Sequence, residues 1–222
     1  MYLFLDKRQK LRYIINMKET IVMIHGFGSG GKTSSTCQMV REHFEKLGHK
    51  VITPSFNSAM LEFSVEELIR RIRLQLTKQD TELTFVGISL GGFFARYLSN
   101  NSVLLFNKPC NDLILLNPAL DAPDRLMERI GTNRDYNTQQ TFTIREDQVR
   151  TLWSYFIEKD KQELNVTLVV TKDDDIVPPD YALEIFKERG RIVTLEKGGH
   201  RFIGQGAKIL AEIEGAINTI AG

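Results

Sequence analysis

A serine between two glycines constrains this chain more than any other feature: the letters GISLGG at residues 87–92 contain Ser89. A short apolar run precedes them and a helix-like run, 93–98, follows. This context predicts a sharp strand-to-helix turn, in which a side chain at Gly87 or Gly91 would collide with the neighbouring strand or helix. Such a turn points the Ser89 hydroxyl outward, at a helix N-terminus that favours negative charge. Ser89 is therefore a candidate nucleophile.

Apolar strand-like segments alternate with amphipathic helix-like segments over most of the chain. We expect strands at 20–24, 50–53, 83–86, 112–116, 166–170 and 192–195. This alternation is typical of a parallel sheet whose two faces are covered by helices. The predicted fold class is α/β, with a mostly parallel sheet and helices on both faces.

Two segments do not follow this alternation. Residues 120–164 combine a short helix that begins at Pro123, a polar stretch through Thr143, and a second helix that carries Trp153 on its apolar face. They predict a small helical lid inserted into the main domain. Residues 1–16 are predicted to be an N-terminal extension, and residues 17–222 to be one folded domain.

Composition narrows the classes of function. With 222 residues, 42% of them hydrophobic, the chain can bury one sizeable core. The net charge of +1 gives no global reason to expect nucleic acid or an anionic membrane. No apolar run is long enough to cross a bilayer, and Cys37 and Cys110 lack the spacing of a zinc site. We expect a cytoplasmic protein with reduced thiols and no metal.

The loop from Gly26 to Thr33 offers a competing interpretation. It fits GxxxxGK[ST], the phosphate-binding P-loop, and it lies between a predicted strand and a predicted helix. Residues 171–174 also resemble a base-reading motif of GTPases. However, no aspartate has a glycine three positions later, and no intervening strand ends in an acidic residue that could hold magnesium. Nucleotide binding remains open as an alternative.

Three reactive side chains follow three predicted strands. In a parallel sheet the carboxyl ends of the strands meet at one edge, so Ser89, the acidic residues 173–175 and His200 are expected there together. The chain order serine, acid, histidine suits a serine that an imidazole deprotonates while a carboxylate holds the imidazole in one tautomer.

Five motifs together resemble the α/β-hydrolase superfamily, in particular its small intracellular esterase-like members. They are HGF at 25–27, GISLGG at 87–92, LLNPA at 115–119, DxxVP at 174–178 and GGH at 198–200. The resemblance implies Ser89 as nucleophile, His200 as general base and Asp174 as the acid that orients it. It also implies that the backbone N–H groups of Phe27 and Leu90 bind the oxyanion.

Four further residues are candidates for substrate binding: His25, Gly26, Asn117 and Trp153. For His25, hydrogen bonding within its own loop is favoured over a role as ligand or base. For Trp153, a place in the lid core is favoured over a substrate cage. The acidic residues 173 and 175 are expected to face water or to cap the helix after Pro178-Pro179.

The sequence therefore predicts a serine hydrolase that cleaves a carboxylic ester or thioester of a small or medium acyl group through an acyl-serine intermediate. The predicted partner is a small-molecule acyl ester, and no cofactor is expected. A P-loop nucleotide-binding protein and a non-catalytic binding module with the hydrolase fold remain as alternatives. The motifs do not describe the pocket, whose shape sets the acyl-chain length, and they do not indicate the oligomeric state.

Overall fold

The sheet forms the centre of the computed structural model, which describes residues 19–134 and 139–218. Its six strands all pair in parallel. In spatial order they are β2 (Lys50–Ile52), β1 (Thr20–Ile24), β3 (Leu83–Ile88), β4 (Cys110–Leu116), β7 (Asn165–Thr171) and β8 (Arg191–Leu195). Every residue of β1 and β3 is buried, as expected for strands with helices on both faces. The predicted fold class is confirmed.

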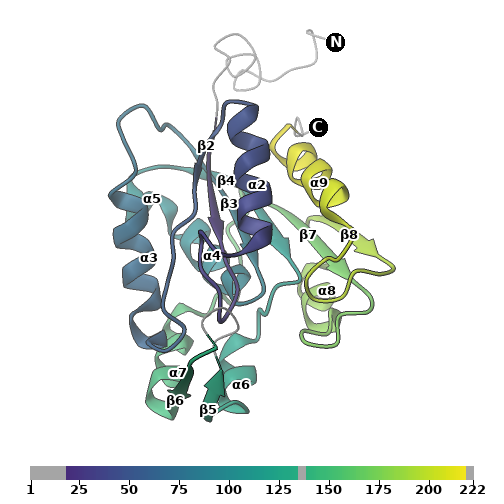
Figure 1. The fold of residues 1–222 in the computed structure, drawn as a ribbon. Helices are drawn as coiled ribbons and strands as arrows, with labels where there is room; N and C mark the ends of the chain where they lie inside the picture. The colour runs from purple at the N-terminus through teal and green to yellow at the C-terminus, as the bar shows by residue number, and fades with distance from the viewer. Residues whose placement is uncertain (1–18, 135–138, 219–222) are drawn as a thin grey trace, which may run out of the picture.

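Helices cover both faces of the sheet (Figure 1). Successive residues of β1 point to opposite faces: Met23 belongs to one buried apolar cluster and Ile24 to the other. The first cluster includes side chains of α2 (Ser35–Lys46) and α9 (Gly206–Asn218). The second includes side chains of α3 (Ser64–Arg73), α4 (Leu90–Asn100), α5 (Ser102–Phe106) and α8 (Asp180–Phe186).

A separate group of short elements lies between β4 and β7 in the chain, beyond the carboxyl ends of the strands (Figure 1). It consists of α6 (Ala122–Met127), β5 (Gly131–Arg134), β6 (Thr141–Ile144), α7 (Glu146–Leu152) and the 3₁₀ turn η3 (Trp153–Tyr155). The polar stretch of the sequence thus contains an antiparallel ribbon, β5 with β6. Tertiary contacts explain the strand: Ile144 is buried, and the ring of Phe142 lies 5.6 Å from that of Phe27.

A 3₁₀ turn, η2 (Leu61–Phe63), runs directly into α3, so Ser64 is already helical and its hydroxyl donates to the Met60 carbonyl. One local prediction differs from the structure. The helix expected to carry Trp153 ends at Leu152, and Trp153 is 46% exposed. The predicted extension, 1–16, lies outside the described residues.

Within the described residues, no helix has both the length and the apolar character needed to cross a membrane.

Candidate active site

Ser89 occupies a strained turn between β3 and α4. Its φ is 55°, in the left-handed region that non-glycine residues rarely adopt. The turn is tight enough to require both flanking glycines. A Cβ on Gly87 would lie 2.4 Å from the carbonyl oxygen of Gly91, and a Cβ on Gly91 would lie 2.3 Å from that of His25. The steric reason predicted for these glycines is therefore confirmed.

A chain of hydrogen bonds joins the serine, the histidine and one aspartate. The Ser89 hydroxyl lies 2.9 Å from Nε2 of His200, and Nδ1 of His200 lies 2.8 Å from Oδ2 of Asp174. The Asp174 side chain is fully buried, and its Oδ1 accepts from the N–H groups of Ile176 and Val177 at 3.0 and 2.8 Å. These two bonds hold the carboxylate in its orientation toward His200. A carboxylate oxygen accepts a hydrogen bond from the Nδ1–H of His200, which leaves Nε2 without a proton and able to accept from the Ser89 hydroxyl. The structure thus brings the three selected residues together.

Asp173 binds the loop that carries His200, at the two glycines that precede the histidine. Its carboxylate accepts from the N–H groups of Gly199 and Gly198 at 2.8 and 3.2 Å, and these bonds, the one from Gly199 foremost, hold the pKa of Asp173 below its usual range. Both glycines have positive φ. Asp173 is exposed, as expected, and it also fixes the turn that precedes His200. Asp175 is exposed, as expected.

Asn117 supports the same loop rather than facing substrate. It is buried, and its Nδ2 donates to the carbonyl oxygen of Gly199 at 3.1 Å. Its Oδ1 accepts from the N–H of Thr171 at 2.9 Å. The side chain therefore ties the ends of β4 and β7 to the loop of His200, and it does not line the cavity described below.

His25 is likewise a buried loop residue. Its Nδ1 donates to the carbonyl oxygen of Gly26 at 2.8 Å, and its Nε2 accepts from the N–H of Phe56 at 3.2 Å while the two rings stack. Gly26 passes directly against the nucleophile: a Cβ there would lie 3.1 Å from the Cβ of Ser89. We therefore assign His25 to the shape of this loop, not to substrate contact.

The burial of His25 predicts a pH-dependent stability. Burial lowers its pKa from 6.5 to about 4, against the opposing hydrogen bond to Gly26. Between these values the unfolded chain binds a proton that the folded protein excludes. The contribution of neutral His25 to the free energy of unfolding is fully present above about pH 6.5, and it is lost as the pH falls toward 4. We expect the free energy of unfolding in urea to drop by about 2 kcal/mol from pH 7 to pH 4.5 through this group. Parallel curves for the parent and His25→Asn would contradict this assignment.

The loop 26–33 differs from a P-loop in its hydrogen bonds. The N–H of Gly28 donates to the Ser58 hydroxyl at 2.8 Å, and that of Gly31 to the Ser55 hydroxyl at 2.9 Å. In a P-loop such backbone N–H groups bind phosphate. The helix begins only at Ser35, after the exposed Lys32. Gly31 has a packing role, since a Cβ there would lie 2.2 Å from the carbonyl oxygen of Thr53.

These contacts predict that Lys32 does not bind nucleotide. We expect neither ATP nor GTP with magnesium to raise the melting temperature, and Lys32→Ala to leave ester hydrolysis close to the parent rate. Thermal shift measurements on both proteins check this. A nucleotide-dependent rise in melting temperature that Lys32→Ala abolishes would restore the P-loop interpretation.

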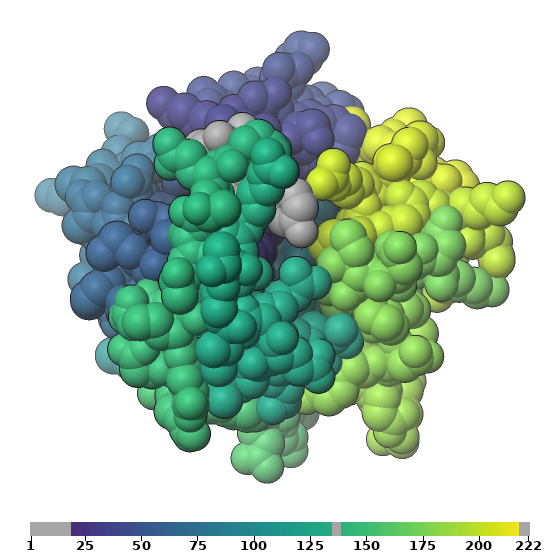
Figure 2. All heavy atoms as spheres, turned by 60° about the horizontal axis from the view of Figure 1, so that its bottom comes forward, coloured from purple at the N-terminus to yellow at the C-terminus, as the bar shows by residue number. Residues whose placement is uncertain are grey.

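Two cavities formed by described residues open beside Ser89. One, of about 180 Å³, has mainly apolar walls from β4–α6, the loop of Phe27 and the loop before α8, and carries three arginines. It is lined by Phe27, Ser89, Leu90, Ala119, Ala122, Arg125, Leu126, Arg129, Ile176, Val177, His200 and Arg201. The other, of about 220 Å³, is polar and is lined by Gly26–Ser29, Thr33–Thr36, Ile88, Ser89, His200 and Arg201. Figure 2 shows this face, with the inserted segment (teal to green) across its middle and the C-terminal loops (yellow) beside it.

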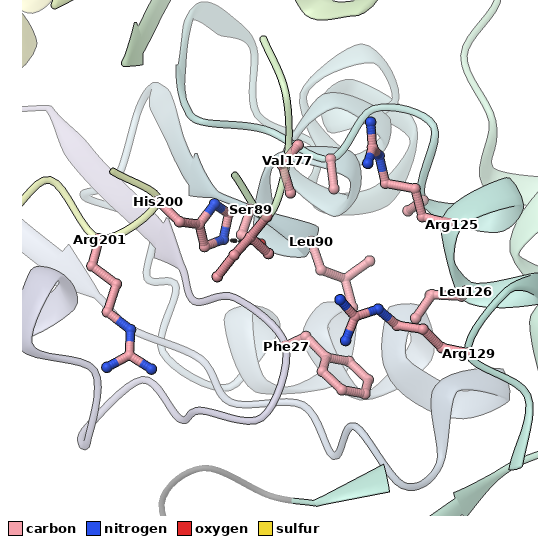
Figure 3. Close-up of a pocket in the computed structure, with 12 residues that line it drawn as sticks. Phe27, Ser89, Leu90, Arg125, Leu126, Arg129, Val177, His200 and Arg201 are labelled. Carbon is pink, nitrogen blue, oxygen red and sulfur yellow. Dashed lines mark hydrogen bonds between the residues drawn. The ribbon is translucent and has the colours of Figure 1, made fainter. Parts of the chain in front are cut away.

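Trp153 lies outside the apolar cavity. Its ring packs against Phe156, and neither residue is among those that line the cavity. Sequence reasoning instead missed Arg125 and Arg129, which carry no motif. The structure places both at the cavity (Figure 3). In the described ranges, no three His, Cys, Asp or Glu side chains are grouped closely enough to hold a metal ion.

The fold and the serine turn define an α/β hydrolase fold, and solved structures agree. Est1E from Butyrivibrio proteoclasticus is 17% identical and matches with a TM-score of 0.70 over 92% of this chain and 89% of its own. Alpha/beta hydrolase domain-containing protein 10 from mouse, also 17% identical, matches with a TM-score of 0.66 over 91% of this chain and 90% of its own. The metagenome-derived lipolytic enzymes LipS and LipT are represented by a structure 14% identical, with a TM-score of 0.65 over 89% and 92%. At these identities the likeness establishes the fold.

The chain belongs to the uncharacterised protein family UPF0227, whose model matches residues 20–214. No curated protein matches the sequence.

Proposed function

We propose that this protein is a serine hydrolase that cleaves a carboxylic ester or thioester through an acyl-serine intermediate. One observation carries the proposal. Ser89, His200 and Asp174 form a continuous hydrogen-bonded chain, with contacts of 2.9 and 2.8 Å, at the mouth of an apolar cavity. A non-catalytic binding module would not require the strained φ of Ser89 or the buried carboxylate behind His200.

The geometry supports a two-step reaction. His200 Nε2 takes the Ser89 proton as Oγ attacks the substrate carbonyl carbon, and the imidazolium that forms is stabilised by Asp174. The tetrahedral intermediate collapses as His200 returns the proton to the leaving oxygen or sulfur. Water, deprotonated by the same imidazole, then attacks the acyl-serine, and Ser89 leaves with the proton.

We assign the oxyanion donors to the backbone N–H groups of Leu90 and Phe27. Leu90 is the first residue of α4, so its N–H has no acceptor within the helix. Both residues line the cavity beside Ser89. Each donor of this kind lowers a barrier by about 3 kcal/mol.

We also propose that residues 120–164 act as a cover over the site. The cavity is walled on this side by Ala122, Arg125, Leu126 and Arg129. Phe142 of the β5–β6 ribbon contacts Phe27. Such a cover excludes water from acyl chemistry.

The neighbours support an ester substrate as a class. Est1E has also been solved with ferulic acid bound, and LipS and LipT are described as lipolytic. A common fold does not fix the reaction, so a direct assay is needed. We propose an assay with a panel of p-nitrophenyl esters and matching acyl thioesters whose acyl chains have from about two to about twelve carbons. Stopped-flow measurements would then follow the first turnover. A burst of product equal to the enzyme concentration would support the acyl-serine, whereas a panel without turnover would refute the function.

A further inference from the structure

Three arginines are among the residues that line the mainly apolar cavity beside Ser89. Arg125 and Arg129 both come from the inserted segment, and Figure 3 shows the Arg129 side chain extending into the cavity toward Leu90. The Arg201 side chain also lines the cavity but is turned toward the other side of His200 (Figure 3). The apolar side chain of Leu90 lies between the Arg129 guanidinium and the Ser89–His200 pair (Figure 3).

The two arginines of the inserted segment differ in their partners. Arg125 donates through Nε to Asp121 at 2.6 Å, which leaves its terminal nitrogens available for a second acceptor. For Arg129, no ion pair with a carboxylate occurs among the described residues. The carboxylate at the catalytic centre, Asp174, is buried and already accepts from His200. The cavity therefore presents a guanidinium with free donors that no protein carboxylate neutralises in the described ranges.

A guanidinium presents a planar set of donors that matches the oxygens of carboxylates and phosphates. We propose that the substrate carries such an anionic group on the part that occupies this cavity, and that Arg129, with Arg125 beside it, binds the group. The apolar wall between Ser89 and the arginines then contacts a short hydrocarbon spacer. This inference rests on the proposed function and specifies its substrate class: an ester or thioester with an anion several atoms from the scissile bond.

The test compares anionic esters with a neutral ester of matched length. The acyl probes are mono-p-nitrophenyl adipate and p-nitrophenyl 6-phosphonohexanoate, and the neutral reference is methyl p-nitrophenyl adipate. A third anionic probe, the hexanoate ester of 5-hydroxy-2-nitrobenzoate, carries the anion on the leaving group, with p-nitrophenyl hexanoate as its reference. The readout is the ratio of kcat/KM for each anionic ester to that of its reference. Because it is a ratio within one protein sample, loss of folded enzyme cancels.

We expect at least one anionic probe to be favoured about tenfold, the size of one good hydrogen bond to a charged group. The preference should shrink at high salt. The ratio should fall to about one in Arg129→Gln and below one in Arg129→Glu, by the reversal of charge. Arg150→Gln is the matched control, because Arg150 lies on α7 of the same insertion, pairs with Glu146 and does not line the cavity. It should keep the parent ratio.

Ratios near one for all three probes, or an unchanged ratio in Arg129→Gln, would overturn the inference. Failure of the proposed function looks different, since then no ester, neutral or anionic, is hydrolysed. In that event the thermal shift produced by monomethyl adipate tests whether the arginines bind an anionic group. A rise in melting temperature that Arg129→Gln removes supports the site, and no rise overturns it.

Discussion

Replacing Ser89 with alanine should reduce hydrolysis of a short p-nitrophenyl ester by a factor on the order of 10⁴ or more, to near the background rate. The hydroxyl is the atom that attacks, and alanine offers none. The fold should survive, because alanine keeps the Cβ and the same backbone requirement at a φ of 55°. Initial rates and the melting temperature of the variant, measured side by side, separate the two effects.

The matched control is Ser154→Ala. Ser154 is an exposed serine of η3 that does not line the cavity, so this variant should turn over at the parent rate. If Ser89→Ala kept more than a small fraction of the parent kcat in a sample free of contaminating esterase, another group would have to be the nucleophile.

The three consecutive aspartates should differ sharply when each becomes asparagine. Asp174→Asn should lower kcat by about 10⁴, because an amide neither holds the reactive tautomer of His200 nor stabilises its imidazolium. Asp173→Asn should cause a smaller loss, since an amide oxygen can still accept from the turn at Gly198–Gly199 that precedes His200. Asp175 is exposed, and Asp175→Asn should match the parent.

The order of the three losses is the informative result. Measured kcat values that fall most at Asp173 or Asp175 would show that a different carboxylate orients His200. A normal kcat in Asp174→Asn would remove the aspartate from the mechanism altogether.

The sequence was sufficient to predict the central part of this site because local physics determines it. Strand, turn and helix around Ser89 follow from a short apolar run and two glycines whose Cβ atoms would meet backbone. The convergence of Ser89, the acidic residues 173–175 and His200 follows from the parallel sheet, since the carboxyl ends of β3, β7 and β8 lie at one edge. The choice of Asp174 among the three acidic residues came from the resemblance to α/β hydrolases.

Contacts between distant segments were beyond such reasoning. The bond of Asp173 to Gly199 joins residues that are 26 positions apart, through a loop whose path no motif describes. Phe142 and Ile144 give the polar stretch its strand by packing against the main domain. Helical periodicity placed Trp153 on the apolar face of a helix, but α7 ends before it. No sequence motif includes Arg129, because its place at the cavity depends on the conformation of the inserted segment.

The central claim is that Ser89 becomes covalently acylated, and an active-site label tests it most directly. The protein is incubated with a fluorophosphonate, digested, and the modified peptide is sequenced by tandem mass spectrometry. The account predicts one adduct per chain, located on Ser89, and none after Asp174→Asn or Ser89→Ala within the time that labels the parent fully. An adduct on another residue, or an unmodified Ser89 in folded protein, would contradict it.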